Sequence, residues 1–204
     1  MSVTFIGIAG YMGAGKSEAC RILAEEGYSI LDGDQLAKEL MRENGNIRSQ
    51  LMREFGKEAA NEHDIDFRVL GSIVFADESQ LKRLNYIVHP VLLKRLREML
   101  AGGTTDTPVV FDAALIPQWH IDDWFDRLIW IHASPEVRLQ RVVTKRPELS
   151  IKEIQRRMRM QEQYLMPPSE DTWTIIENDT DMAILRRKLL ESIGRSPAER
   201  GVGE

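Results

Sequence analysis

The sequence predicts an α/β fold, in which a parallel sheet of about five strands carries helices on both faces. Three observations support this prediction. Short apolar runs of strand length alternate with longer segments whose apolar residues recur at helical spacing. The first strand-like run, residues 3–9, is continuously apolar, as expected for a parallel strand buried on both faces. The first run ends in a glycine-rich loop that leads directly into a helical pattern.

Five segments carry the strand signal. Each is a short apolar run bounded by glycine, proline or polar residues. The predicted strands are residues 3–9, 28–32, 109–112, 127–133 and 172–178.

The segments between these runs carry helix signals. Residues 17–27 form an amphipathic pattern that ends at Gly27, a residue type common at helix C-termini. Residues 81–99 follow the helical period, and Pro90 interrupts them, so we expect a kink or the start of a new helix there. Ser134, followed by proline, is a predicted N-cap, and residues 150–153 form a capping box. A last helix is predicted after the fifth strand.

We predict a single domain over residues 1–195 that carries two insertions. Residues 35–100 show helical patterns and no convincing strand, and they are too long for a plain crossover connection. We expect them to form a helical subdomain. Residues 141–168 are a second insertion and a candidate lid. Residues 196–204 are polar and are expected to form a flexible tail.

Composition limits the classes of function. The chain has 204 residues, a formal net charge of −5 and a single cysteine. The acidic balance disfavours a nucleic-acid binder, and one cysteine gives neither a disulfide framework nor a thiolate metal cluster. The N-terminus lacks the pattern of a signal peptide, and no apolar run approaches the length of a membrane span. We therefore expect a cytoplasmic protein, monomeric or weakly self-associating, with no membrane or nucleic-acid partner.

The strongest functional motif is the loop GYMGAGKS at residues 10–17, which fits G-x-x-x-x-G-K-[ST]. In such a P-loop, backbone amides and the dipole of the following helix hold phosphate groups. The lysine adds positive charge and the serine hydroxyl binds Mg²⁺. The motif therefore predicts a P-loop NTPase fold that binds ATP and Mg²⁺, with Ser17 as the metal ligand. The loop residues predicted to bind ATP are Gly10, Gly13, Ala14, Gly15, Lys16, Ser17 and Glu18.

Acidic residues follow two of the predicted strands. Asp112 could hold Mg²⁺ through water or serve only as a turn carboxylate, and the sequence favours neither. Asp32 and Asp34 lie at the carboxyl end of the second strand, the edge at which ligands bind in open α/β sheets. A carboxylate there can accept the proton of an acceptor hydroxyl during phosphoryl transfer. The residues alone favour a simpler role for Asp34, as the N-cap of the next helix.

Four segments resemble the dephospho-coenzyme A kinase family. They are the P-loop, LDGDQLAKEL (31–40), RVLGSIVFADESQLKRLNYIVHP (68–90) and IIENDTD (175–181). The third segment is the most specific of the four. The similarity runs with matching spacing from about residue 5 to about residue 190.

The resemblance implies that the protein transfers the γ-phosphate of ATP to the ribose 3′-hydroxyl of dephospho-coenzyme A, the last step of coenzyme A biosynthesis. It implies that Asp34 is the general base and acts with Lys16. It places Arg141, in the lid, and Asn178, after the last strand, on the ATP side. The residues that it assigns to the acceptor side are Asp32, Asp34, Lys38, Arg68 and His89.

Some residues depart from the family pattern. Glu18 stands where a threonine is common, and Ala114 and Gln118 replace the proline and glutamate that usually follow the third strand. These departures leave two alternatives: a kinase of another small hydroxyl acceptor, or a non-catalytic ATP-sensing module. The pattern around His89 favours a structural role over a catalytic one.

Three arginines of the candidate lid have two interpretations. They lie either on an exposed helix or on a lid that closes over the ATP phosphates, and the sequence does not single out one of them. They are Arg156, Arg157 and Arg159.

Overall fold

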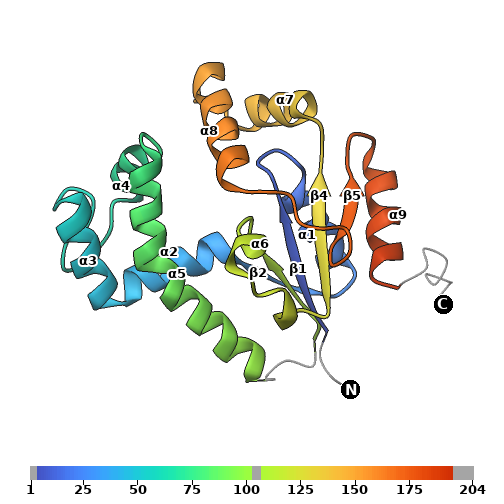
Figure 1. The fold of residues 1–204 in the computed structure, drawn as a ribbon, viewed down its shortest axis with the longest axis horizontal. Helices are drawn as coiled ribbons and strands as arrows, with labels where there is room; N and C mark the ends of the chain where they lie inside the picture. The colour runs from blue at the N-terminus through green and yellow to red at the C-terminus, as the bar shows by residue number, and fades with distance from the viewer. Residues whose placement is uncertain (1–3, 103–106, 195–204) are drawn as a thin grey trace. The chain divides into compact units, whose positions relative to one another are not determined.

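A computed structural model describes residues 4–102 and 107–194 (Figure 1). The predicted tail at 196–204 lies outside the described residues. So do residues 103–106 and Val3, the first residue of the first predicted strand. The chain divides into two compact units, one of residues up to Leu31 and from Thr105 onward and one of Asp32–Thr104. We describe them in turn as the sheet unit and the helical unit.

The sheet unit is built on five parallel strands within the described residues, as predicted. Their order across the sheet is β2-β3-β1-β4-β5. The central strand β1 pairs on one side with β3 and on the other with β4, so that Ile8 lies between Asp112 and Ile129. The strands are β1 (Phe5–Gly10), β2 (Ser29–Asp32), β3 (Val109–Asp112), β4 (Arg127–His132) and β5 (Thr174–Glu177).

Apolar side chains cover both faces of this sheet. One face packs against α1 (Lys16–Glu25) and α9 (Met182–Ser192). On the other face Phe111 stacks on Phe125, with ring centroids 6.2 Å apart, beside α6 (Ile116–Trp119) and the short η1 (Asp122–Trp124). Because side chains alternate along a strand, Val110 joins the first face and Phe111 the second. The apolar runs of β1, β3 and β4 therefore correspond to strands buried on both faces, whereas the edge strands β2 and β5 are more exposed.

Two helices of the candidate lid lie beyond the carboxyl ends of β1 and β4 (Figure 1). They are α7 (Pro135–Lys145) and α8 (Ile151–Tyr164). They pack through Val142, Ile154 and Met158, which are all buried. Ser150 caps α8 as predicted, since its side chain accepts a hydrogen bond from the Glu153 amide at 3.2 Å.

The predicted capping by Ser134 is wrong in one respect. Pro135 begins α7, but the Ser134 side chain caps no amide of that helix. Its backbone N–H and its hydroxyl instead both contact Oδ1 of Asp179, at 2.8 and 3.2 Å. Ser134 therefore attaches the start of α7 to the segment that follows β5.

The helical unit contains four helices among the described residues. Its helices α2, α3 and α4 each pack against the longest one, α5. Leu51, Leu70 and Val88 belong to its core. No strand forms here, and the only β-type contact described is an isolated bridge between Ala60 and Ile65. The helices are α2 (Gly33–Glu43), α3 (Gly45–Phe55), α4 (Phe67–Val74) and α5 (Glu78–Ala101).

Pro90 does not start a new helix, contrary to one of the two expectations for it. It lies inside α5, which runs without a break from Glu78 to Ala101. The buried residues Val88 and Leu92 flank the proline and belong to one apolar stripe. Packing of that stripe offsets the hydrogen bond that a proline removes from a helix interior. No helix in the described part of the chain is long and apolar enough to cross a membrane.

Truncating Leu51 to alanine should destabilise the protein by about 2–5 kcal/mol, because it leaves a cavity in a close-packed core. Leu51 is fully buried in α3, whereas Gln50 beside it is exposed. Urea unfolding followed by circular dichroism measures the change. Gln50→Ala is the matched control and should change stability little. Equal stabilities of Leu51→Ala and the wild type would contradict the described core.

Candidate active site

The P-loop joins β1 to α1, and two of its glycines are required by their backbone conformation. Gly10 has a φ of +149° and Gly15 a φ of +107°, a region that side chains disfavour. A Cβ on Gly10 would collide with the Ile131 carbonyl, and one on Gly15 with the side-chain amide of Asn178. The motif glycines therefore allow the loop to turn tightly between β4 and the segment after β5.

Lys16 and Asp112 lie opposite each other in the sheet unit. Nζ of Lys16 is 3.9 Å from Oδ1 of Asp112, and the two side chains are 20% and 17% exposed. Lys16 is the first residue of α1 and Asp112 the last of β3, so adjacent strands bring them together. The Asp112 carboxylate therefore lies beside the lysine that the motif predicts to bind phosphate.

Arg141 and Asn178 both reach the P-loop. The Asn178 side-chain amide donates to the Ala14 carbonyl at 2.7 Å, and the Arg141 guanidinium donates to the same carbonyl at 3.3 Å. Arg141 also donates to the carbonyl of Asn178 at 2.8 Å. These two residues, assigned to the ATP side by resemblance, thus lie against the loop from two different elements. Their contacts hold the loop's backbone from α7 and from the end of β5.

Glu18, the departure from the family pattern after the loop serine, is paired. Arg21 lies one turn further along α1, and its Nε donates to the Glu18 carboxylate at 2.8 Å. Arg21 also pairs with Glu25. The extra negative charge beside the P-loop is therefore offset by a cation on the same helix.

Two P-loop residues make contacts that the sequence did not indicate. The Met12 amide donates to Oε1 of Gln161 at 2.6 Å, and the Tyr11 hydroxyl donates to the Leu165 carbonyl at 2.9 Å. Gln161 lies in the last turn of α8, and Leu165 follows it. We call these two hydrogen bonds the loop–α8 contacts. They link the P-loop to the end of α8.

Arg138 reinforces these contacts from α7. Its guanidinium lies over the Tyr11 ring, 4.8 Å from the centroid, and pairs with Glu162 of α8. Arg138 is only 2% exposed, so water does not stabilise its positive charge. The Glu162 carboxylate and the Tyr11 ring stabilise that charge instead. Burial, aided by Glu162, raises the pKa of Tyr11 above its ordinary value. The Tyr11 hydroxyl therefore keeps the proton that it donates to Leu165.

Gln118, another departure, donates its side-chain amide to the carbonyl of Tyr164. The two last carbonyl groups at this helix end, those of Tyr164 and Leu165, thus receive hydrogen bonds from Gln118 and Tyr11. Helix C-termini leave such carbonyls without intrahelical partners. A glutamate at position 118 in its ionised form has no proton to donate here.

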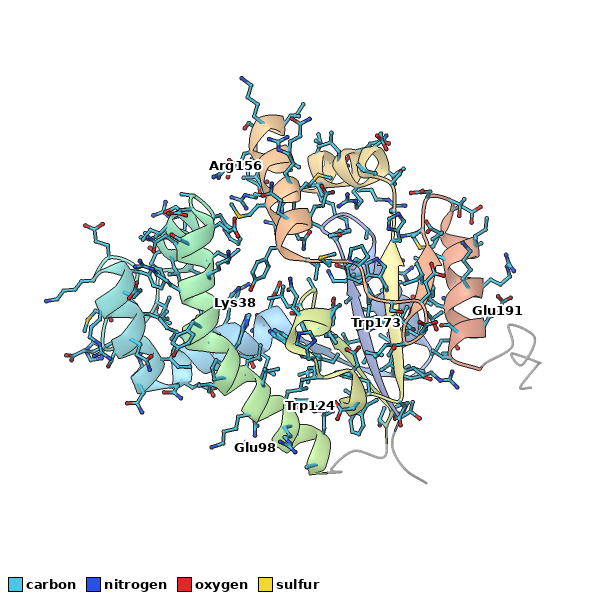
Figure 2. All side chains as sticks on the ribbon, viewed as in Figure 1. Lys38, Glu98, Trp124, Arg156, Trp173 and Glu191 are labelled. Carbon is cyan, nitrogen blue, oxygen red and sulfur yellow. The ribbon has the colours of Figure 1, made fainter. Side chains whose placement is uncertain are left out.

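The contacts of Arg156, Arg157 and Arg159 do not decide between an exposed helix and a lid that closes over the ATP phosphates. Arg157 pairs with Glu153 on the same helix at 2.6 Å. Arg156 and Arg159 are exposed, and Figure 2 shows Arg156 on α8. These contacts assign none of the three arginines to ATP.

In the helical unit, the interpretation of Asp34 as an N-cap is wrong. The helix α2 begins at Gly33, and its N-cap is Asp32, whose carboxylate accepts from the Gln35 amide at 2.9 Å. The start lies two residues earlier than the sequence suggested, because Gly33 enters the first turn. Asp34 is therefore exposed in that turn, with Lys38 one turn further along the same helix. Figure 2 shows Lys38 on α2.

The other two residues that the resemblance assigns to the acceptor side lie on α4 and α5. Arg68 is exposed in the first turn of α4, behind the N-cap Asp66. His89 is partly buried in α5, and burial lowers its pKa to about 4. At neutral pH the imidazole is therefore uncharged.

In the described ranges, 4–102 and 107–194, no group of three or more His, Cys, Asp and Glu side chains could hold a metal ion. Mg²⁺ commonly takes only one or two protein oxygens and completes its shell with water and phosphate. The hydroxyl of Ser17 and the carboxylate of Asp112 are hard oxygen donors of this kind. They fit a nucleotide-bound Mg²⁺ rather than a metal held by protein alone.

Comparison with known proteins identifies the family. The dephospho-CoA kinase family profile matches residues 4–183. A dephospho-CoA kinase of Streptomyces avermitilis is 36% identical over 142 residues, which cover 69% of each chain. The chain belongs to the dephospho-CoA kinase family. Its members are kinases, so this chain is a transferase that uses a nucleotide and a small-molecule substrate.

Two further comparisons extend the match along the chain. A dephospho-CoA kinase of Fusobacterium nucleatum is 28% identical over 193 residues, 93% of this chain and 96% of that one. The solved structure of TT1252 from Thermus thermophilus is 30% identical, with a TM-score of 0.71 over 95% of this chain and 98% of that one. The similarity therefore includes both the sheet unit and the helical unit.

Replacing Gln161 with methionine should weaken ATP binding about fivefold, because it removes one hydrogen bond that holds a P-loop amide. Isothermal titration with a non-hydrolysed ATP analogue measures the affinity. Gln163→Met is the matched control, since Gln163 is exposed on the same helix turn. Wild-type affinity in Gln161→Met would show that the loop–α8 contacts do not prepare the P-loop for nucleotide.

His89 should make stability depend on pH below neutrality. Its pKa is about 4 in the folded protein and about 6.5 in the unfolded chain, so between these values the unfolded state binds more protons. Stability should therefore fall as pH drops from about 6.5 towards 4. Urea unfolding of the wild type and of His89→Gln across this range isolates the effect. Parallel curves for the two proteins would contradict it.

Proposed function

We propose that the protein transfers the γ-phosphate of ATP to the ribose 3′-hydroxyl of dephospho-CoA and so forms CoA. The observation that carries the proposal is a complete P-loop, with Lys16 facing Asp112, in a chain whose family match spans residues 4–183. The P-loop supports the phosphoryl donor, and the family match supports the acceptor.

In the proposed mechanism the P-loop amides and Lys16 bind the phosphates of ATP. Lys16 lies near the carboxylate of Asp112 and can exchange that contact for a phosphate oxygen, since the two atoms are 3.9 Å apart. Arg141 and Asn178 keep the loop in shape through the Ala14 carbonyl. Mg²⁺, held by Ser17 and by Asp112 through water, would neutralise charge on the phosphates.

Asp34 is the proposed general base. The N-cap role belongs to Asp32, and the Asp34 carboxylate is exposed in the first turn of α2. In the reaction the 3′-oxygen forms a bond to the γ-phosphorus, and the bond from that phosphorus to the β–γ bridging oxygen breaks. The hydroxyl proton goes to Asp34, and ADP leaves. Asp32, Lys38, Arg68 and His89 are proposed to shape the acceptor side.

The alternatives drawn from the departures lose their support in this structure. Glu18 is neutralised by Arg21, so its charge does not argue against phosphate binding. Gln118 has a structural partner in Tyr164, so its presence does not by itself indicate a different acceptor. Neither a kinase of another acceptor nor an ATP-sensing module is favoured by a contact in the described residues.

Incubation with Mg·ATP and dephospho-CoA should yield ADP and CoA in equal amounts. Asp34→Asn should lower kcat by about 10²–10⁴-fold, the usual contribution of a general base. A coupled assay for ADP with chromatographic detection of CoA measures both products. Glu43→Gln, exposed at the end of α2, is the control and should retain activity.

Two results would overturn parts of this proposal. ATP binding without ADP formation that depends on the acceptor would exclude dephospho-CoA as the substrate. Full activity of Asp34→Asn would leave the reaction in place but remove Asp34 as its base.

A further inference from the structure

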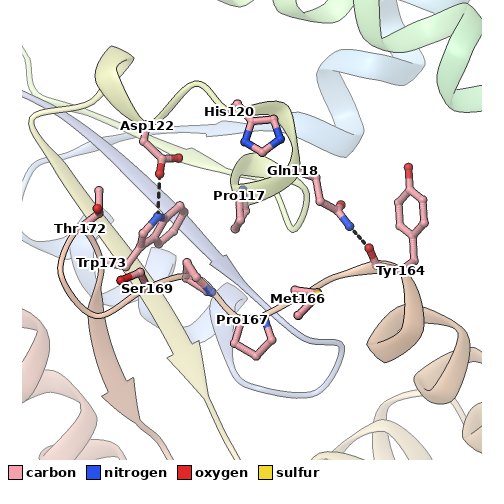
Figure 3. Close-up of a pocket in the computed structure, with 11 residues that line it drawn as sticks. Pro117, Gln118, His120, Asp122, Tyr164, Met166, Pro167, Ser169, Thr172 and Trp173 are labelled. Atoms are coloured by element: carbon pink, nitrogen blue, oxygen red, sulfur yellow. Dashed lines mark hydrogen bonds between the residues drawn. The ribbon is translucent and has the colours of Figure 1, made fainter.

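The sheet unit contains a cavity of about 410 Å³ beside α6 (Figure 3). One wall is the segment from α6 to η1, and the other is the segment from the end of α8 to β5. The lining mixes apolar and polar groups, among them Pro117, Met166, Pro167, Thr172 and Trp173. The cavity is distinct from the P-loop residues, none of which lines it.

Two acceptor atoms of the lining residues are buried without a hydrogen-bond partner among the described residues. They are Oε1 of Gln118 and Oδ1 of Asp122. The orientation of both groups is fixed by their other atoms. The amide nitrogen of Gln118 donates to Tyr164, and Oδ2 of Asp122 accepts from the Trp173 indole at 3.2 Å, as Figure 3 shows. An unpartnered buried acceptor is costly, so a ligand that donates hydrogen bonds here is favoured.

The charge of the lining disfavours a phosphate ligand. The lining residues include the carboxylate of Asp122 and the imidazole of His120, and neither lysine nor arginine. Phosphate sites in proteins use cations or converging backbone amides. The cavity therefore suits a neutral ligand that carries N–H or O–H donors and methylene groups.

We propose that this cavity binds the pantetheine arm of dephospho-CoA. The inference rests on the proposed function, because it takes dephospho-CoA as the acceptor. Its ribose must meet the γ-phosphate of ATP, and its pyrophosphate is an anion, so the neutral parts that remain are the adenine and the pantetheine arm. Of these two, the arm is the one that carries methylene segments. The arm is neutral, with two amide N–H groups, a hydroxyl and methylene segments. These donors match the free acceptors of Gln118 and Asp122, and the methylenes match the proline and methionine walls.

The cavity is also linked to the lid. Gln118 and Tyr164 both line it and are bonded to each other, and Leu165, the next residue, accepts from Tyr11 of the P-loop. A pantetheine arm in the cavity would therefore contact the end of α8, which also contacts the P-loop.

Filling the cavity tests the proposal without disturbing the P-loop. Thr172 is exposed and lines the cavity, so Thr172→Trp should block it. Glu170→Trp is the matched control, because Glu170 is exposed on the same segment and does not line the cavity. We expect kcat/KM for dephospho-CoA to fall at least tenfold in Thr172→Trp alone, with the KM for ATP unchanged.

A second pair of variants tests the hydrogen bonds. In Asp122→Asn the side-chain oxygen must face the Trp173 N–H, which places an NH₂ donor where the free acceptor was. The expected loss in kcat/KM for dephospho-CoA is about tenfold, since a hydrogen bond to a charged acceptor is replaced by two opposed donors. Asp123→Asn, exposed beside it, should have no effect. Thermal unfolding checks that all four variants are folded.

Adenosine 5′-monophosphate, which has the same ribose hydroxyl but no arm, separates the outcomes. Its phosphorylation should be the same in the wild type, Thr172→Trp and Asp122→Asn. Unchanged kcat/KM for dephospho-CoA in these variants, or an equal loss with both acceptors, would overturn the arm site. Absence of CoA formation by the wild type would instead overturn the proposed function.

Discussion

The backbone of the P-loop is the constraint on which the sheet unit depends. Gly10, Gly13 and Gly15 all have positive φ, so the loop turns back on itself within a few residues. Such a turn persists only where its surroundings hold it. Here β4 lies against Gly10, α7 against Gly13 and Asn178 against Gly15, close enough that a Cβ at any of the three would collide with them. β4, α7 and the residue after β5 therefore all pack closely against this one loop.

The same loop shares its polar groups with the lid. The Ala14 carbonyl accepts from Arg141 of α7, and the Met12 amide and Tyr11 hydroxyl contact the last turn of α8 and the residue after it. A displacement of α8 would release a P-loop amide and leave helix carbonyls without donors. The P-loop and the two helices of the candidate lid are therefore linked through hydrogen bonds as well as through apolar packing.

The strands and the P-loop were predictable because their signals are local. Each strand contains consecutive apolar residues, and the loop motif occupies eight consecutive positions. The loop–α8 contacts were not predictable, since Met12 and Gln161 are 149 positions apart and a glutamine on a polar helix has no distinctive pattern. The start of α2 was placed at the wrong residue because Asp32 and Asp34 are both good N-caps, and only the geometry of Gly33 decides between them.

Gln118 shows how sequence and structure differ in what they indicate. In the sequence it departs from the family pattern and so puts the identity of the acceptor in question. In the structure the two atoms of its amide group have different surroundings. The nitrogen bonds the end of α8, and the oxygen is free beside the cavity. A glutamate in the same position would add a second carboxylate to the cavity lining that contains Asp122. Its negative charge would also be repelled by the Tyr164 carbonyl oxygen. Replacing that charge with a neutral amide suits a cavity whose occupant is itself neutral. Gln118 and the chemistry of the cavity are therefore both compatible with dephospho-CoA as the acceptor, and Gln118 does not indicate a different one.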